Sequence, residues 1–561
     1  MAEMSFDSGQ RRLEVGLTSV VDRRVAHPMP APSGRGPLAG CSPIVSQGRC
    51  KMVGMALQAS STPDSLTGRA EARRVRASEE LDGRRGDLGQ FFTPAPIAEL
   101  LAQMFEPIAG TARMLDAGAG VGSLTAAVVA RAAGEGWPVD LRAHAVEVDE
   151  NLIPRLKETL QECEAALAGM TAELHTRDFI AWGVEQIGSS LFAQDRATFE
   201  VAILNPPYRK LNTASWERRR LTEVGIEATN LYSAFVALVL RLLGPGGQLV
   251  AITPRSFCNG PYFKAFRQEL LGSAALRRIH VFESRDMAFR DADVLQENVV
   301  FHLVKGADQG DVVIASSDGG GGSVNERRVS FSTVVRPGDP NLFFHIVADE
   351  SASGAAGQVD SLAGTLDRVG AAVSTGRVVD FRAREHLRME PDEGTVPLLY
   401  PLHLRGGRVR WPAVSAKKAN ALIACDETRR LLLPRGNYVL VKRFSSKEER
   451  RRVVATVLQA DDLDADQVAI ENHVNVFHHR NAGLSLDLAW GIASYLNSTT
   501  VDVFFRQFNG HTQVNATDLR SLRYPSVDQL SALGTAARSV EHDQRVIDAL
   551  VKRFVPELAR A

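Results

Sequence analysis

The sequence predicts an α/β fold built around a largely parallel sheet, because short apolar runs alternate with segments of helical period over residues 66–310. Four of these runs end in, or are followed by, glycine, acidic or Asn-Pro residues. Such residues are typical of the crevice at the carboxyl ends of parallel strands, where ligands bind. From about residue 363 the pattern changes to short strands and turns, which predicts a second domain of mixed α+β class.

The composition limits the kind of protein that the chain can be. A length of 561 residues predicts two or three domains, and a hydrophobic content of 44% is enough for their cores. Because the formal net charge is −1, any contact with nucleic acid must come from local basic clusters. The five cysteines show neither a CxxC pair nor a metal-binding spacing, which predicts a reduced, cytoplasmic protein without a metal site. No apolar run reaches the length of about 18 residues that spans a membrane, so no membrane partner is expected.

The first 65 residues are rich in Gly, Pro, Ser and Arg and have neither helical nor strand period. We therefore predict a disordered N-terminal arm over residues 1–65. Met52 and Met55 lie just ahead of the part that is expected to be ordered, so either could be the true start. The composition becomes helical from Arg69 to about Asp82.

The next motif is Phe92-Thr93-Pro94. Thr93 is expected to cap a helix whose first residue is Pro94 and which ends near Phe105. An ordinary capped helix would explain the threonine and the proline. It would not explain the two phenylalanines, Phe91 and Phe92, that precede them.

A glycine-rich junction follows between a predicted strand at 112–116 and a predicted helix at 124–131. Glycines at such a junction let the backbone approach a ligand that faces the helix N-terminus. The spacing departs from the GxGxxG fingerprint, which disfavours a nicotinamide cofactor. The residues of this motif are Asp116, Gly118, Gly120 and Gly122.

Two further acids stand near the ends of predicted strands. Glu147 lies in the strand 143–148, at about the offset from the glycines that is expected of an acid binding both hydroxyls of a ribose. Asp178, followed by Phe179, comes after the strand 172–175 and could accept a hydrogen from an adenine amino group. Taken alone, each acid is more often a surface charge.

The fourth apolar run, 199–204, ends at Asn205-Pro206-Pro207-Tyr208. This motif offers an amide oxygen, a peptide carbonyl whose direction the prolines fix, and an aromatic face. Two acceptors beside an aromatic face suit a planar ring that carries an NH2 group. A simple proline turn after a strand is the alternative, and four residues alone would favour it. The ligand groups at the ends of the other three strands make a binding site the better interpretation.

The remaining runs predict helices at 230–243 and 261–271 and strands at 249–253, 278–282 and 298–304. The strand total is then seven, and the last two strands are expected to form an antiparallel edge. Residues 306–324 are rich in glycine and predict a loop within a linker or insertion over 311–362. A final helix is expected over 527–561.

Residues 363–526 contain several basic clusters with aromatic residues between them. Each cluster alone is more often a solvated surface, but their concentration in one region predicts a nucleic-acid face. The basic residues that we expect to contact the substrate are Arg405, Arg408, Lys442 and Arg443.

With these motifs in this order, the chain resembles the N6-adenine DNA methyltransferases of the gamma arrangement, and most closely the PstI/BsuBI-like modification methylases. The resemblance covers roughly residues 86–525. It is made more specific by the phrases Tyr438–Ser446 and His511–Asp518, which look like those of this subfamily. The N-terminal arm has no counterpart in the family that we can place.

The resemblance implies that S-adenosylmethionine binds on a Rossmann-like, seven-stranded class I methyltransferase sheet. Phe92-Thr93-Pro94 would then pack on the methionine end of the cofactor, and Asp116 to Gly122 would form the glycine loop. Glu147 would bind the ribose, and the pair Asp178-Phe179 would bind the adenine.

The resemblance also implies the reaction, which is methyl transfer to N6 of an adenine flipped out of duplex DNA. Asn205 and Pro206 would hold the amino group, with Pro207 fixing the turn, and Tyr208 would stack on the base. Phe289 is our candidate for a second stacking ring. A separate restriction endonuclease encoded nearby could be a partner. The alternatives are a methyltransferase of RNA or of a protein glutamine amide, and a DNA-binding protein that has lost catalysis.

Overall fold

The structure is a computed structural model of the 561-residue chain. No helix within its described residues is both long enough and apolar enough to cross a membrane. Residues 1–61 of the predicted N-terminal arm and the candidate ring Phe289 lie outside the described residues. The ranges that the structure describes are 62–80, 92–188, 198–282, 297–317, 324–346, 350–415, 417–444, 451–508, 513–540 and 543–559.

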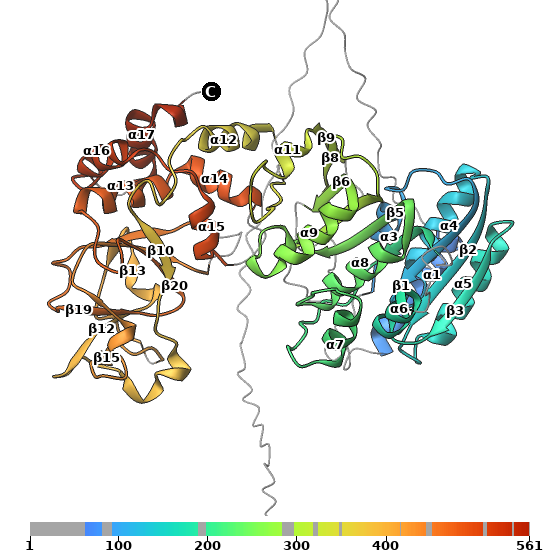
Figure 1. Cartoon of the computed structure of the whole chain (residues 1–561), viewed down its shortest axis with the longest axis horizontal. Coiled ribbons are helices and arrows are strands. Elements are labelled where there is room, and N and C mark those ends of the chain that lie inside the picture. The colour runs from blue at the N-terminus through green and yellow to red at the C-terminus, as the bar shows by residue number, and fades with distance from the viewer. Residues whose placement is uncertain are drawn as a thin grey trace, which may run out of the picture. The chain divides into compact units, whose positions relative to one another are not determined.

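A nine-stranded sheet forms the core of the N-terminal half (Figure 1), in the order β3-β2-β1-β4-β5-β7-β6-β8-β9. Strands β1 to β5 run parallel to one another, and β7 lies antiparallel between β5 and β6. This arrangement confirms the predicted α/β class with its largely parallel sheet. The bounds are β1 Gly110–Ala117, β2 Val139–Glu147, β3 Thr171–Thr176, β4 Phe199–Leu204, β5 Leu243–Pro254, β6 Ala274–Phe282, β7 Asn298–Lys305, β8 Val312–Ser317 and β9 Asn325–Val329.

Two details of the predicted sheet are wrong. Strands β6 and β7 pair antiparallel as expected, but they do not form the edge, because β8 and β9 extend the sheet beyond β6. The predicted loop at 306–324 therefore contains a strand at Val312–Ser317. The strand has only a short alternation of buried side chains, at Val312 and Ile314, and a run of glycines follows it. The glycine-rich composition of the whole segment therefore led to the prediction of a loop.

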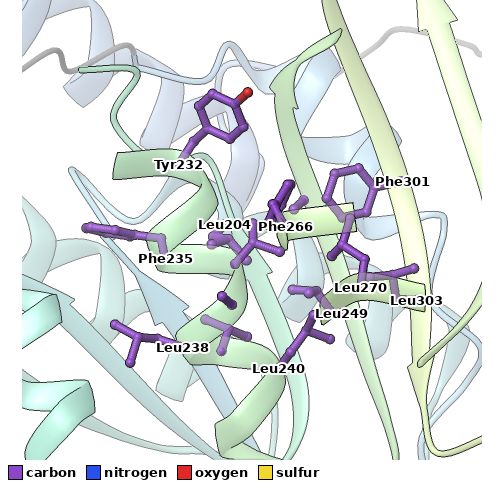
Figure 2. Close-up of a cluster of buried hydrophobic side chains, with 14 of the residues drawn as sticks. Leu204, Tyr232, Phe235, Leu238, Leu240, Leu249, Phe266, Leu270, Phe301 and Leu303 are labelled. Carbon is purple, nitrogen blue, oxygen red and sulfur yellow. The ribbon is translucent and has the colours of Figure 1, made fainter. Parts of the chain in front are cut away.

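Helices cover both faces of the sheet because successive residues of its strands point to opposite sides. Met114, Val201 and Val250 pack with the helices α3 and α4, whereas Leu115 and Leu204 pack with α6, α8 and α9. Figure 2 shows this second cluster, in which Phe235 and Leu238 of α8 lie over Leu204 and Leu249 of the sheet. The helix bounds are α1 Leu66–Glu80, α3 Ala95–Ala102, α4 Ser123–Glu135, α5 Ile153–Ala166, α6 Phe179–Gly188, α7 Trp216–Glu223, α8 Leu231–Leu242 and α9 Lys264–Ser273.

The C-terminal half contains two smaller sheets and five α-helices among its residues from 363 that the structure describes. Two short helices, α11 Phe331–Val334 and α12 Glu350–Asp360, precede it. The six-stranded sheet has the order β10-β20-β17-β18-β14-β13, and the five-stranded sheet has the order β11-β15-β12-β19-β16. The strands are β10 Ala372–Thr375, β11 Leu387–Arg388, β12 Thr395–Leu399, β13 Leu404–Arg405, β14 Arg408–Val409, β15 Ala421–Ile423, β16 Leu432–Pro434, β17 Tyr438–Lys442, β18 Ala455–Leu458, β19 Gln467–Ile470 and β20 Val474–His478.

The helices of this half pack against each other through small residues. The segment expected as one helix after residue 527 forms two, α16 Val527–Ala537 and α17 Gln544–Phe554. A Cβ atom added at Gly534 of α16 would lie 1.7 Å from the carbonyl oxygen of Asp487 in α13, so only glycine permits this approach. The remaining helices are α13 Leu486–Leu496, α14 Thr499–Phe508 and α15 Ala516–Ser521.

Candidate active site

A pocket opens at the carboxyl ends of strands β1, β2 and β4, as expected for a parallel sheet. Its empty volume, part of which is open solvent, is about 970 Å³. The sequence motifs, which are separated by up to about 110 residues, converge here. The predicted site residues that line the pocket are Phe92, Thr93, Gly118, Gly120, Glu147, Asp178, Phe179, Asn205 and Pro207.

The glycine loop between β1 and α4 adopts a conformation that other residues avoid. Gly120 and Gly122 have φ angles of 60° and 84°, which lie in the left-handed region. A Cβ atom at Gly122 would also come within 3.0 Å of side chains of Leu156 and Thr159 on α5. The loop therefore stays close to α5, and Gly120 faces the pocket with its backbone exposed to a ligand.

Glu147, the last residue of β2, is held by backbone amides. Its Oε2 accepts a hydrogen bond of 2.8 Å from the Gly120 N–H, and its Oε1 accepts bonds of 2.8 Å from the N–H groups of Val148 and Asp149. Burial raises the pKa of the Glu147 carboxyl, and these backbone hydrogen bonds oppose the rise. The arrangement fixes both carboxylate oxygens at the pocket wall and leaves one lone pair, on Oε2, open to a further donor.

Asp116 lies behind the pocket and does not line it. The Thr125 hydroxyl donates a hydrogen bond of 2.7 Å to its Oδ2, and among the described residues its buried Oδ1 has no partner. Burial raises the pKa of the Asp116 carboxyl to about 7. Gly122 and Pro94 also lie outside the pocket lining.

Asp178 and Phe179 follow β3 and line the pocket. Asp178 precedes α6, and its Oδ1 accepts a hydrogen bond of 2.9 Å from the Ala181 N–H. Burial raises the pKa of the Asp178 carboxyl. The ring centroid of Phe179 lies 4.7 Å from that of Phe235, so the acid sits beside an apolar surface that a flat ring could cover.

Asn205 directly follows β4, and two hydroxyls hold its side-chain amide. The Nδ2 group donates a hydrogen bond of 3.0 Å to Thr93 Oγ1, and Oδ1 accepts a hydrogen bond of 2.9 Å from the Tyr208 O–H. The prediction that Thr93 caps a helix is wrong. Helix α3 begins at Ala95 with Pro94 in the cap position, and no side chain caps it.

Pro206 and Tyr208 lie in the motif but do not line the pocket. The Tyr208 ring packs edge-on against Tyr232 of α8, with centroids 6.3 Å apart and planes at 86°. Burial raises the pKa of the Tyr208 hydroxyl far above its ordinary value, so this hydroxyl stays protonated and able to donate. Tyr232 stands above the apolar cluster in Figure 2.

Comparison with known proteins agrees with this geometry. Residues 132–289 match the family model of the Eco57I restriction-modification methylase. The chain is 43% identical over 504 residues to the type II methyltransferase M.PstI of Providencia stuartii, covering 88% of this chain and 98% of the relative. The type II methyltransferase M.BsuBI of Bacillus subtilis is 46% identical over 455 residues, covering 80% of this chain and 90% of the relative. The chain belongs to this family of type II restriction-modification methyltransferases.

The solved structure of the type IIL restriction-modification enzyme MmeI in complex with DNA aligns with this methyltransferase at 10% identity. The alignment covers 87% of this chain and 72% of that one, with a TM-score of 0.45. That score is too low to add to the family assignment. The fold class therefore rests on the strand order and on the M.PstI and M.BsuBI relatives.

The pocket of the methyltransferase also has walls that the sequence reading missed. Val148 follows Glu147 and is 48% exposed, which places an apolar side chain beside the ribose-binding candidate. Arg209 and Glu217 form an ion pair of 2.7 Å, and both line the pocket. Val148 directly follows Glu147, and Arg209 directly follows Tyr208, so their positions next to motif residues could have indicated that they line the pocket. Arg177, Leu231 and Phe235 also line the pocket and were not predicted.

The four basic residues predicted to contact the substrate are not brought together by the structure. Arg405 and Arg408 pair across a tight hairpin, and the Arg408 guanidinium lies 5.8 Å from the Trp490 ring on α13. Lys442 ends β17, which β18 separates from β14. Arg443 donates a hydrogen bond of 3.2 Å to the Asn472 carbonyl.

One group of side chains in the described part of the methyltransferase has a spacing that a metal could use. His144 Nδ1 lies 3.1 Å from His175 Nε2, and Glu173 lies 3.5 Å from the first ring and 3.4 Å from the second. The two rings are within 4° of parallel, and their nitrogens are within hydrogen-bond distance. Burial and the nearby Arg113 guanidinium lower the pKa of His144 to about 4, so this imidazole is neutral at pH 7.

Proposed function

We propose that this methyltransferase transfers a methyl group from S-adenosylmethionine to N6 of an adenine flipped out of duplex DNA. It would act as the modification enzyme of a restriction-modification system. The observation that carries the proposal is the position of Asn205, which lines a pocket that also contains Glu147 and Asp178. Membership of the type II restriction-modification methyltransferases supports it.

The pocket residues fit the cofactor. Glu147 presents a fixed carboxylate whose Oε2 can accept a further hydrogen bond from a ribose hydroxyl, and Asp178 can accept one from an adenine amino group. Val148, Phe179 and Phe235 supply apolar walls for a flat ring. When bound, S-adenosylmethionine supplies a methyl group on an electron-poor sulfonium.

The motif residues can make an amino group nucleophilic. The lone pair of adenine N6 is delocalised into the ring, which makes the nitrogen a poor nucleophile. Asn205 Oδ1 and the Pro206 carbonyl are two acceptors that can take its two hydrogens and leave the lone pair directed at the methyl group. Pro207 keeps the Pro206 carbonyl in a fixed direction. Since a paired adenine keeps N6 inside the duplex, the base must leave the stack, and the Tyr208 ring can pack on it.

Two acceptors on a flat surface would also hold the amide of a protein glutamine or a base of RNA. The C-terminal half favours duplex DNA, because it adds two sheets with exposed basic and aromatic side chains to the methyltransferase half. Arg405, Arg408, Lys442 and Arg443 are our candidates for DNA contacts, and Phe289 remains the candidate for the second stacking ring. A restriction endonuclease encoded nearby is the partner expected for a modification enzyme.

Sequencing of modified bases tests the proposal. The wild-type chain and its Asn205→Ala variant are expressed in a host that lacks its own DNA methylation, and genomic DNA from both is read for modified bases. We expect N6-methyladenine at one short sequence with the wild type and none with the variant. Modified cytosine instead of adenine, or unmodified DNA with both chains, would contradict the proposed target.

A further inference from the structure

The side chain of Thr93 reaches the catalytic motif from a different part of the chain. It is 5% exposed, lines the pocket and accepts the hydrogen bond of 3.0 Å from Asn205 Nδ2. We propose that Thr93 is a positioning residue that fixes which end of the Asn205 amide faces the target amino group. The inference rests on the proposed function, because it concerns the same reaction.

The orientation of the amide matters because its two ends have the same shape and opposite chemistry. Oδ1 accepts hydrogen bonds, whereas Nδ2 donates them. A half-turn of the amide would place the Nδ2 hydrogens where the acceptor for an amino group has to be. Two donors would then face each other, and the target nitrogen would not be activated. Molecules in which the Asn205 amide is turned the wrong way would be inactive. As their share rises, the observed rate of transfer falls, although no contact to the cofactor is lost.

The structure holds the amide at both ends with hydroxyls of different kinds. A hydroxyl can donate or accept, so two identical hydroxyls would tolerate either orientation. A phenol, with a pKa of about 10, is a stronger donor than an aliphatic hydroxyl. Tyr208 O–H therefore favours bonding to Oδ1, which leaves Thr93 Oγ1 to accept from Nδ2, and these are the partners observed. The pair of residues thus favours the orientation that exposes an acceptor.

Both hydroxyls are attached to firmly held segments. Tyr208 packs on Tyr232, whose hydroxyl lies 2.9 Å from Ser256 Oγ and whose ring stacks on Phe263 at 5.5 Å. On the other side, the Ala95 N–H donates a hydrogen bond of 2.9 Å to Glu71 of α1, only two residues after Thr93.

This second support continues within α1, where Glu71 forms an ion pair of 2.6 Å with Arg74. The amide of Asn205 is thereby held between one support built from α1 and α3 and another built from α8 and the segment after β5. Such supports reduce the motion of a reacting group, and displacement by about 1 Å can cost about 100-fold in rate.

A matched pair of substitutions tests the role of the hydroxyl. Thr93→Val has the shape of threonine but lacks the hydroxyl, and Thr93→Ser keeps the hydroxyl. In single-turnover methylation of duplex DNA we expect Thr93→Val to be about 10- to 100-fold slower than the wild type and Thr93→Ser to be within about threefold of it. The dissociation constants for cofactor and DNA should stay within about threefold for both variants, so that the loss appears in kcat and not in KM. Equal rates for Thr93→Val and the wild type would overturn the inference.

A double-mutant cycle separates positioning of Asn205 from any direct contact of Thr93 with a ligand. In an Asn205→Ala background, Thr93→Val should cause no further loss, because the group that it positions is absent. A further loss of about the same factor in that background would show that Thr93 acts by itself, and would reject the proposed role.

A neutron crystal structure of the Thr93→Val protein without DNA locates the amide hydrogens and so distinguishes Oδ1 from Nδ2. It supplies a readout that does not depend on the proposed substrate. We expect the Asn205 side chain to be rotated or spread over two orientations, with hydrogen-bond partners that differ from those of the wild type. An Asn205 that keeps the same partners would overturn the inference. If instead the wild type methylates no DNA while the Asn205 side chain does rotate, the proposed function fails and the positioning role stands.

Discussion

The methyltransferase half and the C-terminal half differ in how sequence order relates to position in space. In the parallel sheet, residues that follow β1, β2, β3 and β4 meet in one pocket although the chain separates them. In the six-stranded sheet, whose strand pairs are antiparallel except for β14 with β18, neighbouring residues along a strand point to opposite faces. Arg408 pairs with Val457, whose side chain packs with α13 on one face of the sheet. Lys442 lies two residues after Leu440 and therefore points, like Leu440, to the other face. A motif at a strand end therefore predicts a site better than a cluster of charges along a strand does.

The largest expected effect lies in the pocket, at Asn205. Asn205→Ala removes an oriented acceptor for the target amino group, so transfer should fall by about 100-fold or more while cofactor and DNA still bind. Single-turnover methylation with titrations of both ligands measures this. Asn212→Ala, at an exposed asparagine on the following loop, is the matched control and should keep its rate. If Asn205→Ala transferred the methyl group at the wild-type rate, the catalytic role proposed for Asn205 in this pocket would be wrong.

A smaller effect is expected at Glu147, which we propose binds the cofactor's ribose. Glu147→Ala removes charge-assisted hydrogen bonds, so the dissociation constant for S-adenosylmethionine should rise about 10-fold or more. Calorimetry measures the change, and the exposed neighbour Glu150 provides the control variant Glu150→Gln. If calorimetry showed tight NADH binding and no S-adenosylmethionine binding, the cofactor assignment would have to be abandoned.

The two faces of the C-terminal sheet should contribute unequally to DNA binding. Lys442 lies two residues before the exposed Phe444, whose ring centroid is 5.0 Å from that of His473. This combination of basic and aromatic groups suits DNA binding better than the face that carries Arg405 and Arg408. We expect Lys442→Ala to weaken DNA binding by about 3- to 10-fold. The slope of the logarithm of the binding constant against the logarithm of the salt concentration should become shallower by about one, as for the loss of one phosphate contact. Arg405→Ala, on the face of Arg408, should weaken DNA binding less than Lys442→Ala does. The exposed Arg429 supplies the control Arg429→Ala, and the reverse ranking of Lys442 and Arg405 would assign DNA to the other face.

The smallest effect concerns the buried Asp116 behind the pocket. Burial raises the pKa of its carboxyl from 3.8 to about 7, so the folded protein keeps a proton that the unfolded chain has already lost. Folding stability should therefore fall as the pH rises from about 4 to about 7. The Asp116→Asn variant lacks this titration. We expect the difference in melting temperature, variant minus wild type, to be about 2 °C or more larger at pH 8 than at pH 4.5 in thermal melts. A difference that does not change with pH would contradict the raised pKa of Asp116.

The sequence predicted those elements whose signal is local. The strand ending at Leu204 was placed correctly, and its motif was assigned to the pocket edge, because an apolar run and Asn-Pro-Pro adjoin in the chain. Thr93 was misassigned because a threonine before a proline also satisfies the local rule for a helix cap. Its actual partner, Asn205, lies 112 residues away and leaves no trace near Thr93 in the sequence.

Two other omissions have similar physical causes. Helix α7 was not predicted, because most of its residues are charged and only Glu217 and Leu221 of them are buried. The faces of the C-terminal sheet depend on which residue pairs with which across strands, and this register cannot be read from a count of basic residues. The predicted total of seven strands omitted β8, which is followed by a run of glycines, and β9, in which four of the five residues are polar.

Those two added strands change what the sheet presents at its end. An edge strand exposes unpaired backbone N–H and C=O groups, to which the strand of another molecule can attach and start aggregation. Without β8 and β9, the end strand would be β6, where buried apolar side chains such as Ile279 lie beside the wholly buried centre of β7. Strand β9 instead ends the sheet with Glu326, Arg327 and Arg328, and five residues of backbone give a neighbouring chain little length to pair with. The extension therefore protects the molecule from edge-to-edge association and keeps the apolar strands inside.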